Sequence, residues 1–239
     1  MVKSTFKNSI DGLSDLFKDE TDIPGGSVIL VTGVEGGLKS GLVFNIISNY
    51  LASNDKYALY ATLEETEESH SRNMKSLGIK KHDRLHIFDY MDVRHEWKNE
   101  EPDFLKVTEE MINFYREKYA DFSIFAFDSL NALYSLSSNL NIRKQIYHFF
   151  TMLRTRKLTS FLIMETHSPD RHLLIGTGGY MERPEFFLAD GIIELGIVED
   201  KESVKRYIQI RKMRGVNHNM EKHQILVGKN GLMVVGSIY

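Results

Sequence analysis

The sequence has no cysteine among its 239 residues. This absence excludes disulfide bonds, iron–sulfur clusters, thiolate zinc sites and cysteine nucleophiles. The chain also lacks any apolar run near the roughly 20 residues that a membrane-spanning helix needs, and its polar N-terminal stretch has no targeting signal. We therefore expect a soluble, cytoplasmic protein with no membrane partner.

An excess of positive charge is missing as well. The sequence holds 30 Lys and Arg residues against 33 Asp and Glu residues, so its net charge is −3. No global basic field is available to hold a nucleic acid. The Gly-x-Ser-x-Gly signature of many hydrolases is also absent. What remains is an ordinary globular composition, with 42% hydrophobic and 26% charged residues.

The order of the predicted elements indicates an α/β fold. Short strand-like runs alternate with segments of helical periodicity, and the predicted strands are Ser27–Thr32, Lys56–Thr62, Leu85–Phe88, Phe122–Phe127 and Ser160–Glu165. Four further strands follow without a helix between them, at Gly191–Ile197, Tyr207–Met213, His223–Val227 and Leu232–Val235. This order predicts a mostly parallel twisted sheet flanked by helices and closed by antiparallel C-terminal strands. No linker or repeat interrupts it, so we expect one domain over residues 1–239.

A glycine-rich segment between the first strand and its helix is the first candidate site. A phosphate-binding loop needs a sharp turn, inward-pointing N–H groups, a lysine for the phosphates and a hydroxyl for Mg²⁺. Lys39 supplies the charge and Ser40 the hydroxyl, and the alternative is a glycine turn without a ligand. The candidate nucleotide-binding residues are Gly33, Glu35, Gly36, Gly37, Leu38, Lys39, Ser40 and Gly41.

One position of this loop departs from the usual pattern. Leu38 stands directly before Lys39, where such loops normally have glycine. A leucine can serve there if its φ is negative, or if Gly36 and Gly37 absorb the turn. This departure leaves open whether hydrolysis is slow.

Acidic residues follow two of the other predicted strands. Asp128 ends a buried strand, where it could organise the water shell of Mg²⁺; the alternative is that it caps the next helix. Glu64 and Glu65 follow the second strand, where a carboxylate can orient or deprotonate an attacking water. The next two glutamates, Glu67 and Glu68, are better explained as partners of a helix dipole.

A basic run near the C-terminus is the last candidate. In a regular strand Ile208, Ile210, Lys212 and Arg214 all point to one face. This pattern predicts a core-facing strand whose end emerges at an anionic site. A solvated, charged edge strand is the alternative.

These motifs together resemble the KaiC-like branch of the RecA superfamily of P-loop ATPases, over nearly the whole chain. Besides the phosphate loop, Leu63–Thr66 is similar to the catalytic glutamate pair of that family, and Phe127–Leu130 to its metal-binding strand. The most specific match is Lys-Met-Arg-Gly-x-x-His at Lys212–His218.

The resemblance implies ATP and Mg²⁺ as cofactors, with Ser40 and Asp128 at the metal. It implies that Glu64 and Glu65 are catalytic, and that Lys212, Arg214 and His218 reach the nucleotide of a neighbouring subunit. Our leading hypothesis is therefore an ATPase that acts as a homo-oligomeric ring, with a hexamer as the expected form.

Two other functions remain open at this stage. A recombinase-like protein would bind single-stranded DNA through a loop at Ser168–Pro184, but the near-neutral charge of that loop does not favour nucleic acid. A slow or non-catalytic ATP sensor would instead switch the binding of a regulatory protein partner.

Overall fold

The computed structural model describes residues 5–91, 103–136, 141–166, 184–200 and 203–238. Their strands are β1 (Val28–Gly33), β2 (Tyr57–Thr62), β3 (Leu85–Asp89), β4 (Phe122–Asp128), β5 (Thr159–Glu165), β6 (Gly191–Asp200), β7 (Ser203–Met213), β8 (His223–Gly228) and β9 (Gly231–Ser237). The helices are α1 (Lys39–Ala52), α2 (Glu67–Ser76), α4 (Phe104–Lys118), α5 (Leu130–Leu136), α6 (Ile142–Thr155) and α7 (Pro184–Leu188), with two short 3₁₀ turns at Phe6–Asn8 and Leu13–Leu16.

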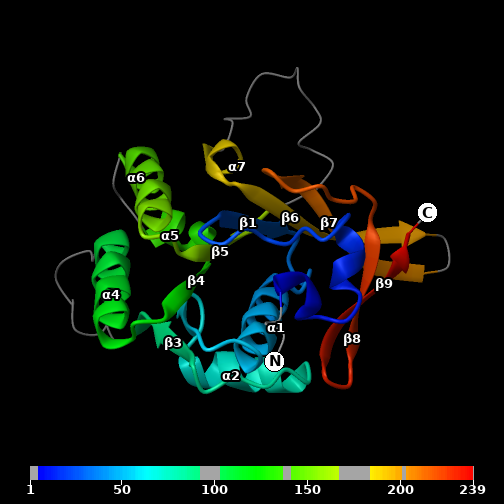
Figure 1. The fold of residues 1–239 in the computed structure, drawn as a ribbon, viewed down its shortest axis with the longest axis horizontal. Coiled ribbons are helices and arrows are strands. Elements are labelled where there is room, and N and C mark those ends of the chain that lie inside the picture. Colours follow the sequence, from blue (N-terminus) through cyan, green and yellow to red (C-terminus); the bar gives the residue numbers. More distant parts are fainter. Residues whose placement is uncertain (1–4, 92–102, 137–140, 167–183, 201–202, 239) are drawn as a thin grey trace.

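The described strands form one sheet of nine, in the order β3-β2-β4-β5-β1-β6-β7-β8-β9 (Figure 1). The strands from β3 to β6 are parallel, and β7, β8 and β9 each run antiparallel to their neighbour. The predicted fold class is therefore confirmed. Among the described residues, no helix is long and apolar enough to cross a bilayer.

The central strands are buried on both faces, which is why they read as continuous apolar runs. In β1, Ile29 and Val31 pack into one core cluster with α1, while Val28 and Leu30 pack into a second with α4 and α6. Helices thus cover both faces of the sheet. The carboxyl ends of the parallel strands meet at one edge, and the candidate residues of the loop and of β4 lie there.

The basic strand differs from its predicted form. The register between β6 and β7 shifts so that Ile193 faces Ile210 but Ile192 faces Lys212, which leaves Arg211 as an extra residue. An extra residue in one strand reverses which side chains point to which face. Ile208 and Ile210 therefore enter the core beside α1, while Lys212 turns to the other face. The expectation that all four residues share one face is wrong.

Candidate nucleotide-binding site

The glycine-rich loop joins the end of β1 to the start of α1, as predicted. Gly33 lies so close to β6 that a Cβ atom there would stand 2.1 Å from the carbonyl oxygen of Leu195. Gly36 has a φ of +70° and open space around its Cα atom. The loop thus needs glycine at these two positions for different reasons, close approach at the first and a left-handed turn at the second.

Leu38 adopts neither of the arrangements expected for it. Its φ is +70° and its ψ is 24°, so the leucine itself takes the left-handed conformation in addition to Gly36. This conformation costs an L-residue about 1–2 kcal/mol. The partly buried side chain packs against the core cluster beside α1. The hydrophobic contact therefore offsets part of the strain, and the loop keeps the turn that glycine would give.

Lys39 is the first residue of α1, and its amine lies inside the turn of the loop. The Nζ atom donates to the carbonyl oxygen of Val34 at 2.8 Å and lies 3.9 Å from Oε2 of Glu165. Burial lowers the pKa of Lys39 below its usual value, while the carboxylates of Glu165, Asp128, Glu64 and Glu35 oppose this shift, in decreasing order. The loop amine is thus surrounded by acidic groups from several strand ends.

Asp128 is buried at the end of β4, with a side chain held by two hydroxyls. Tyr60 donates a hydrogen bond of 2.6 Å to its Oδ2 atom, and Ser40 also hydrogen-bonds the carboxylate. Burial raises the pKa of Asp128 to about 6, against the effect of these two bonds. Asp128 does not cap the next helix, because the Oγ atom of Ser129 accepts from the Ala132 amide at 3.3 Å instead.

The two glutamates after β2 point in different directions. The exposed Glu64 accepts a hydrogen bond from Ser129 and interacts electrostatically with Lys39. Glu65 is half-buried, and its Oε2 atom accepts from Nδ2 of Asn73 in α2 at 2.8 Å. The structure therefore brings Glu64 to the loop and directs Glu65 toward α2.

The basic residues Lys212 and Arg214 lie toward the amino-terminal end of the parallel strands, away from the loop. Arg214 donates from its backbone to Asp190, which donates to the carbonyl oxygen of Val28. Val28 precedes Gly33 by five residues, so this level of the sheet is about 16 Å from the start of the loop at 3.3 Å per residue. Arg214 therefore does not meet the phosphate loop of its own chain, and the amine of Lys212 is directed to backbone carbonyls near α7 instead.

Both cations are bonded to the segment around α7. Lys212 donates to the carbonyl oxygens of Phe186 at 3.1 Å and Ala189 at 2.7 Å, and burial lowers its pKa below the usual value. The guanidinium of Arg214 is 3.1 Å from Asp190 and 3.0 Å from the carbonyl oxygen of Phe187. His218 is half-buried and its Nδ1 atom is 3.0 Å from the carbonyl oxygen of Val216.

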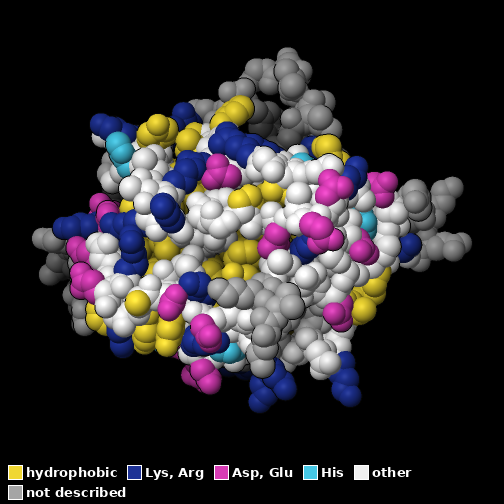
Figure 2. Space-filling model, viewed as in Figure 1, with side chains coloured by type: hydrophobic (Ala, Val, Ile, Leu, Met, Phe, Trp, Pro, Cys, Tyr) yellow, Lys and Arg dark blue, Asp and Glu magenta, His cyan; other side chains and the backbone are white. Residues whose placement is uncertain are grey.

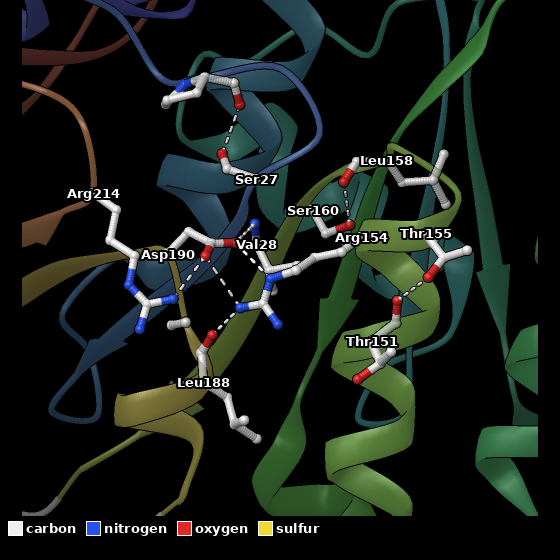
Figure 3. A network of polar contacts seen from close by, with 12 residues as sticks. Ser27, Val28, Thr151, Arg154, Thr155, Leu158, Ser160, Leu188, Asp190 and Arg214 are labelled. Carbon is white, nitrogen blue, oxygen red and sulfur yellow. Dashed lines mark hydrogen bonds and ion pairs between the residues drawn. The ribbon is translucent and has the colours of Figure 1, made fainter.

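Asp190 is the centre of this network (Figure 3). Its carboxylate accepts from Arg154 of α6 at 3.0 Å, from Arg214 at 3.1 Å and from the Val28 amide at 3.0 Å. Burial alone would raise the pKa of Asp190, but the hydrogen bonds from Arg154 and Val28, with a smaller effect of Arg214, hold it below its usual value. One carboxylate thus joins β1, α6 and the end of β7.

The surface near this network is basic. Figure 2 shows Lys and Arg side chains gathered with hydrophobic ones over α6 and α7, at the upper left of that view. The sequence gives the reason, since residues 129–164 hold no Asp or Glu. The two ends of the sheet therefore differ in charge, with carboxylates around the loop and cations near α7.

The oxygen groups beside Lys39 fit a magnesium ion. Mg²⁺ prefers oxygen ligands and usually keeps several waters, with one or two protein groups and the phosphates of a substrate. Ser40 and Asp128 supply a hydroxyl and a carboxylate that already contact each other. Among the described residues, no group of three or more His, Cys, Asp or Glu side chains is placed to hold a metal ion. The donor set thus suits a cation that arrives with a nucleotide better than a metal held by protein alone.

Three residues near the loop were not predicted from the sequence. Tyr60 resembles an ordinary apolar strand residue until its hydroxyl is placed. Glu165 ends β5 beside β1, and its position at the carboxyl end of a parallel strand was the signal that could have identified it. Arg206 of β7 donates to the carbonyl oxygen of Gly36 at 3.1 Å, and nothing local in the sequence indicates this contact.

Comparisons with known proteins agree with this geometry. The circadian clock oscillator protein KaiC of Prochlorococcus marinus is 24% identical over 94% of this chain, which spans 44% of that protein. A UPF0273 protein of Aeropyrum pernix is 26% identical, with 95% of this chain and 92% of that protein aligned. The crystal structure of a KaiC-like protein from Pyrococcus horikoshii has the same fold, with a TM-score of 0.74, 24% identity, and coverage of 98% and 99% of the two chains.

The family model described as "ATPase: KaiC" matches residues 6–238, which is almost the entire sequence. The match includes the phosphate loop, Asp128 and the basic run together. The chain therefore belongs to the KaiC ATPase family, whose RecA-like fold binds ATP.

Proposed function

We propose that the protein binds and hydrolyses MgATP in a homo-oligomeric ring, a hexamer, in which each site is completed by the adjacent copy. The observation that carries this proposal is the position of Lys39. Its amine lies in the turn of a glycine-rich loop at the start of α1, near carboxylates that follow β1 and β2 and that end β4 and β5. A partly buried cation at a helix N-terminus suits a triphosphate.

The residues of one chain would divide the work as follows. The loop amides and Lys39 bind the phosphates, and the hydroxyl of Ser40 and the carboxylate of Asp128 hold the cation. When bound, Mg²⁺ neutralises charge on the phosphate oxygens. Glu64 orients the attacking water and accepts its proton. Glu65 is the second glutamate of the pair, and its hydrogen bond to Asn73 anchors the segment that carries Glu64 to α2. The contact between Ser129 and Glu64 fixes the glutamate beside the loop.

The trans part of the proposal is supported by the arrangement of the sheet. By the strand rise, Arg214 lies about 16 Å along the strands from the start of the loop of its own chain, and the backbone of Lys212, at the level of Leu30, about 10 Å. If two unlike surfaces of one chain bind each other between copies, the contact is head-to-tail, and it closes as a ring or continues as a filament. In such an assembly the cations near α7 would meet the acidic loop end of the next copy. Together with His218 they would stabilise charge that develops on the γ-phosphate.

Two variants test this assignment. Lys39→Ala should lose both nucleotide binding and hydrolysis. Arg214→Ala should retain binding and lose about 10³-fold or more of the hydrolysis rate, as expected for an arginine that acts on the transferred phosphate. Binding of a fluorescent ATP analogue and release of phosphate are the measurements, at protein concentrations high enough for assembly. Normal hydrolysis by Arg214→Ala would refute the trans site.

Leu38 bears on the alternative of a slow ATP sensor that regulates a protein partner. Its partly buried side chain packs against the core cluster beside α1, and this contact gives no reason for slow turnover. Slow turnover stays a prediction. Comparing the phosphate release of Leu38→Gly with that of the wild type, at saturating MgATP, measures the effect. The loop proposed for single-stranded DNA lies almost wholly outside the described residues.

A further inference from the structure

Tyr60 is a polar residue in a place where phenylalanine would fill the space equally well. It lies in β2 beside Ala126 of β4, and its side chain is fully buried. A hydroxyl in such a place is costly unless it has a hydrogen-bond partner. Its partner is Oδ2 of Asp128, at 2.6 Å. The oxygen of this tyrosine is therefore directed at the residue that we assign to the cation.

The ring of Tyr60 is fixed from two sides. Phe44 of α1 meets it edge-on, with ring centroids 5.5 Å apart, and His70 of α2 lies at 4.6 Å. Helix α1 also carries Ser40, whose hydroxyl interacts with both Tyr60 and Asp128. The three oxygen-bearing side chains thus contact one another, and the packing of α1 and α2 on β2 fixes where the phenol points.

We propose that Tyr60 is a positioning residue for the magnesium ion of the nucleotide. Its hydroxyl holds the carboxylate of Asp128 in a single rotamer. The side chain therefore loses no further conformational entropy when the cation binds. This inference rests on the proposed function, because it takes Asp128 and Ser40 as the cation-facing groups. Outer-shell partners of metal ligands typically contribute 10–100-fold to metal affinity. The phenol should therefore act on the cation and not on the nucleotide as such.

The experiment compares Tyr60→Phe with Tyr90→Phe. Tyr90 is a matched control, because it is also almost fully buried and its hydroxyl is also hydrogen-bonded, to Thr108 of α4. The full chain is titrated with a fluorescent ATP analogue in EDTA, and then with Mg²⁺ at a fixed concentration of the analogue. We expect Tyr60→Phe to leave binding in EDTA within about twofold of the wild type and to weaken the apparent Mg²⁺ affinity about tenfold. Tyr90→Phe should change neither.

The outcomes separate the two proposals. A wild type whose nucleotide binding ignores Mg²⁺ contradicts the proposed function itself. A wild type that responds to Mg²⁺, with a Tyr60→Phe variant that responds equally, overturns only the role of Tyr60. Equal losses with and without Mg²⁺ also overturn it, since they would indicate a purely structural residue.

A second variant keeps the test usable if Tyr60→Phe does not fold. In this second variant 4-aminophenylalanine replaces Tyr60. Its amino group is a weaker hydrogen-bond donor than the phenol but still points at Asp128, and the ring fills the same space. Its apparent Mg²⁺ affinity should be intermediate, weaker than that of the wild type by about threefold. An unchanged affinity would contradict the proposal, because the strength of the hydrogen bond would then be irrelevant.

Discussion

His70 is a buried residue whose ionisation makes the stability of the fold depend on pH. Only 1% of its surface is exposed, it packs against Phe44 and Tyr60, and burial lowers its pKa to about 4. In the unfolded chain the pKa returns to about 6.5. Between these values the unfolded chain binds the proton more readily, so the contribution of His70 to stability is present above pH 6.5 and is lost as the pH falls toward 4.

His70→Leu should remove this dependence. We expect the free energy of unfolding of the wild type, relative to that of His70→Leu, to fall by about 2.5 kcal/mol between pH 7 and pH 4.5. Urea denaturation at several pH values measures it. Asp128, with a raised pKa of about 6, acts in the opposite direction in part of this range. Because both proteins contain Asp128, their difference isolates His70, and a difference that does not vary with pH would contradict the argument.

Gly33 and Gly36 offer a second test at the scale of single residues. A Cβ atom at Gly33 would stand 2.1 Å from a backbone oxygen of β6, whereas one at Gly36 would meet nothing within 4 Å. Gly33→Ala should therefore cost about 2–3 kcal/mol through overpacking. Gly36→Ala should cost about 1 kcal/mol through its positive φ alone. Urea denaturation without nucleotide compares them, and equal losses would refute the distinction.

At the scale of elements, Asp190 joins strands and helices that are far apart in the sequence. Its side chain is 19% exposed and binds Arg154, Arg214 and the amide of Val28. Asp190→Ala would leave the amide and Arg154 without this partner, so we expect a loss of about 3 kcal/mol of stability. The control is Asp121→Ala, which breaks a surface pair with Lys56 and should cost less than about 1 kcal/mol. Denaturation curves that rank the two variants the other way would contradict this role.

The elements that could be predicted from the sequence are those with a strong local pattern. Buried parallel strands read as apolar runs, so the positions of the strands up to residue 165 and of the loop after β1 could be predicted from hydrophobicity and glycine. The antiparallel C-terminal strands were likewise evident, since no helical period separates them.

The features that sequence reasoning missed depend on contacts between distant segments. The extra residue at Arg211 reverses the facing of Lys212, and a bulge of this kind has no marker in the sequence of one strand. Asp128 and Ser129 could each cap α5, and only the coordinates assign the cap to the serine. The conformation of Leu38 could not be predicted without knowing that its side chain packs against the core. The role of Tyr60 could not be predicted without knowing that β4 lies beside β2 and brings Asp128 to its hydroxyl.

At the scale of the whole molecule, the proposed site is divided between the two ends of the sheet. The acidic loop end and the basic end near α7 lie on opposite sides of the parallel strands, so a complete site would need two copies. Two variants that are each inactive for different reasons should then complement each other. Lys39→Ala keeps the cations near α7, and Arg214→Ala keeps the loop.

Mixing these two variants is the decisive assembly experiment. With equal amounts and random assembly in a ring, about one interface in four pairs an intact loop with intact cations, so phosphate release should recover to about a quarter of the wild-type rate. A cis site would gain nothing from mixing, because every chain would still lack one essential residue. The control is a mixture of Lys39→Ala with a Lys39→Ala/Arg214→Ala double variant, which has no intact loop and must stay inactive. Recovery in the first mixture alone would require cations that act across the boundary between copies, and no recovery in subunits shown to exchange would remove that role from Arg214.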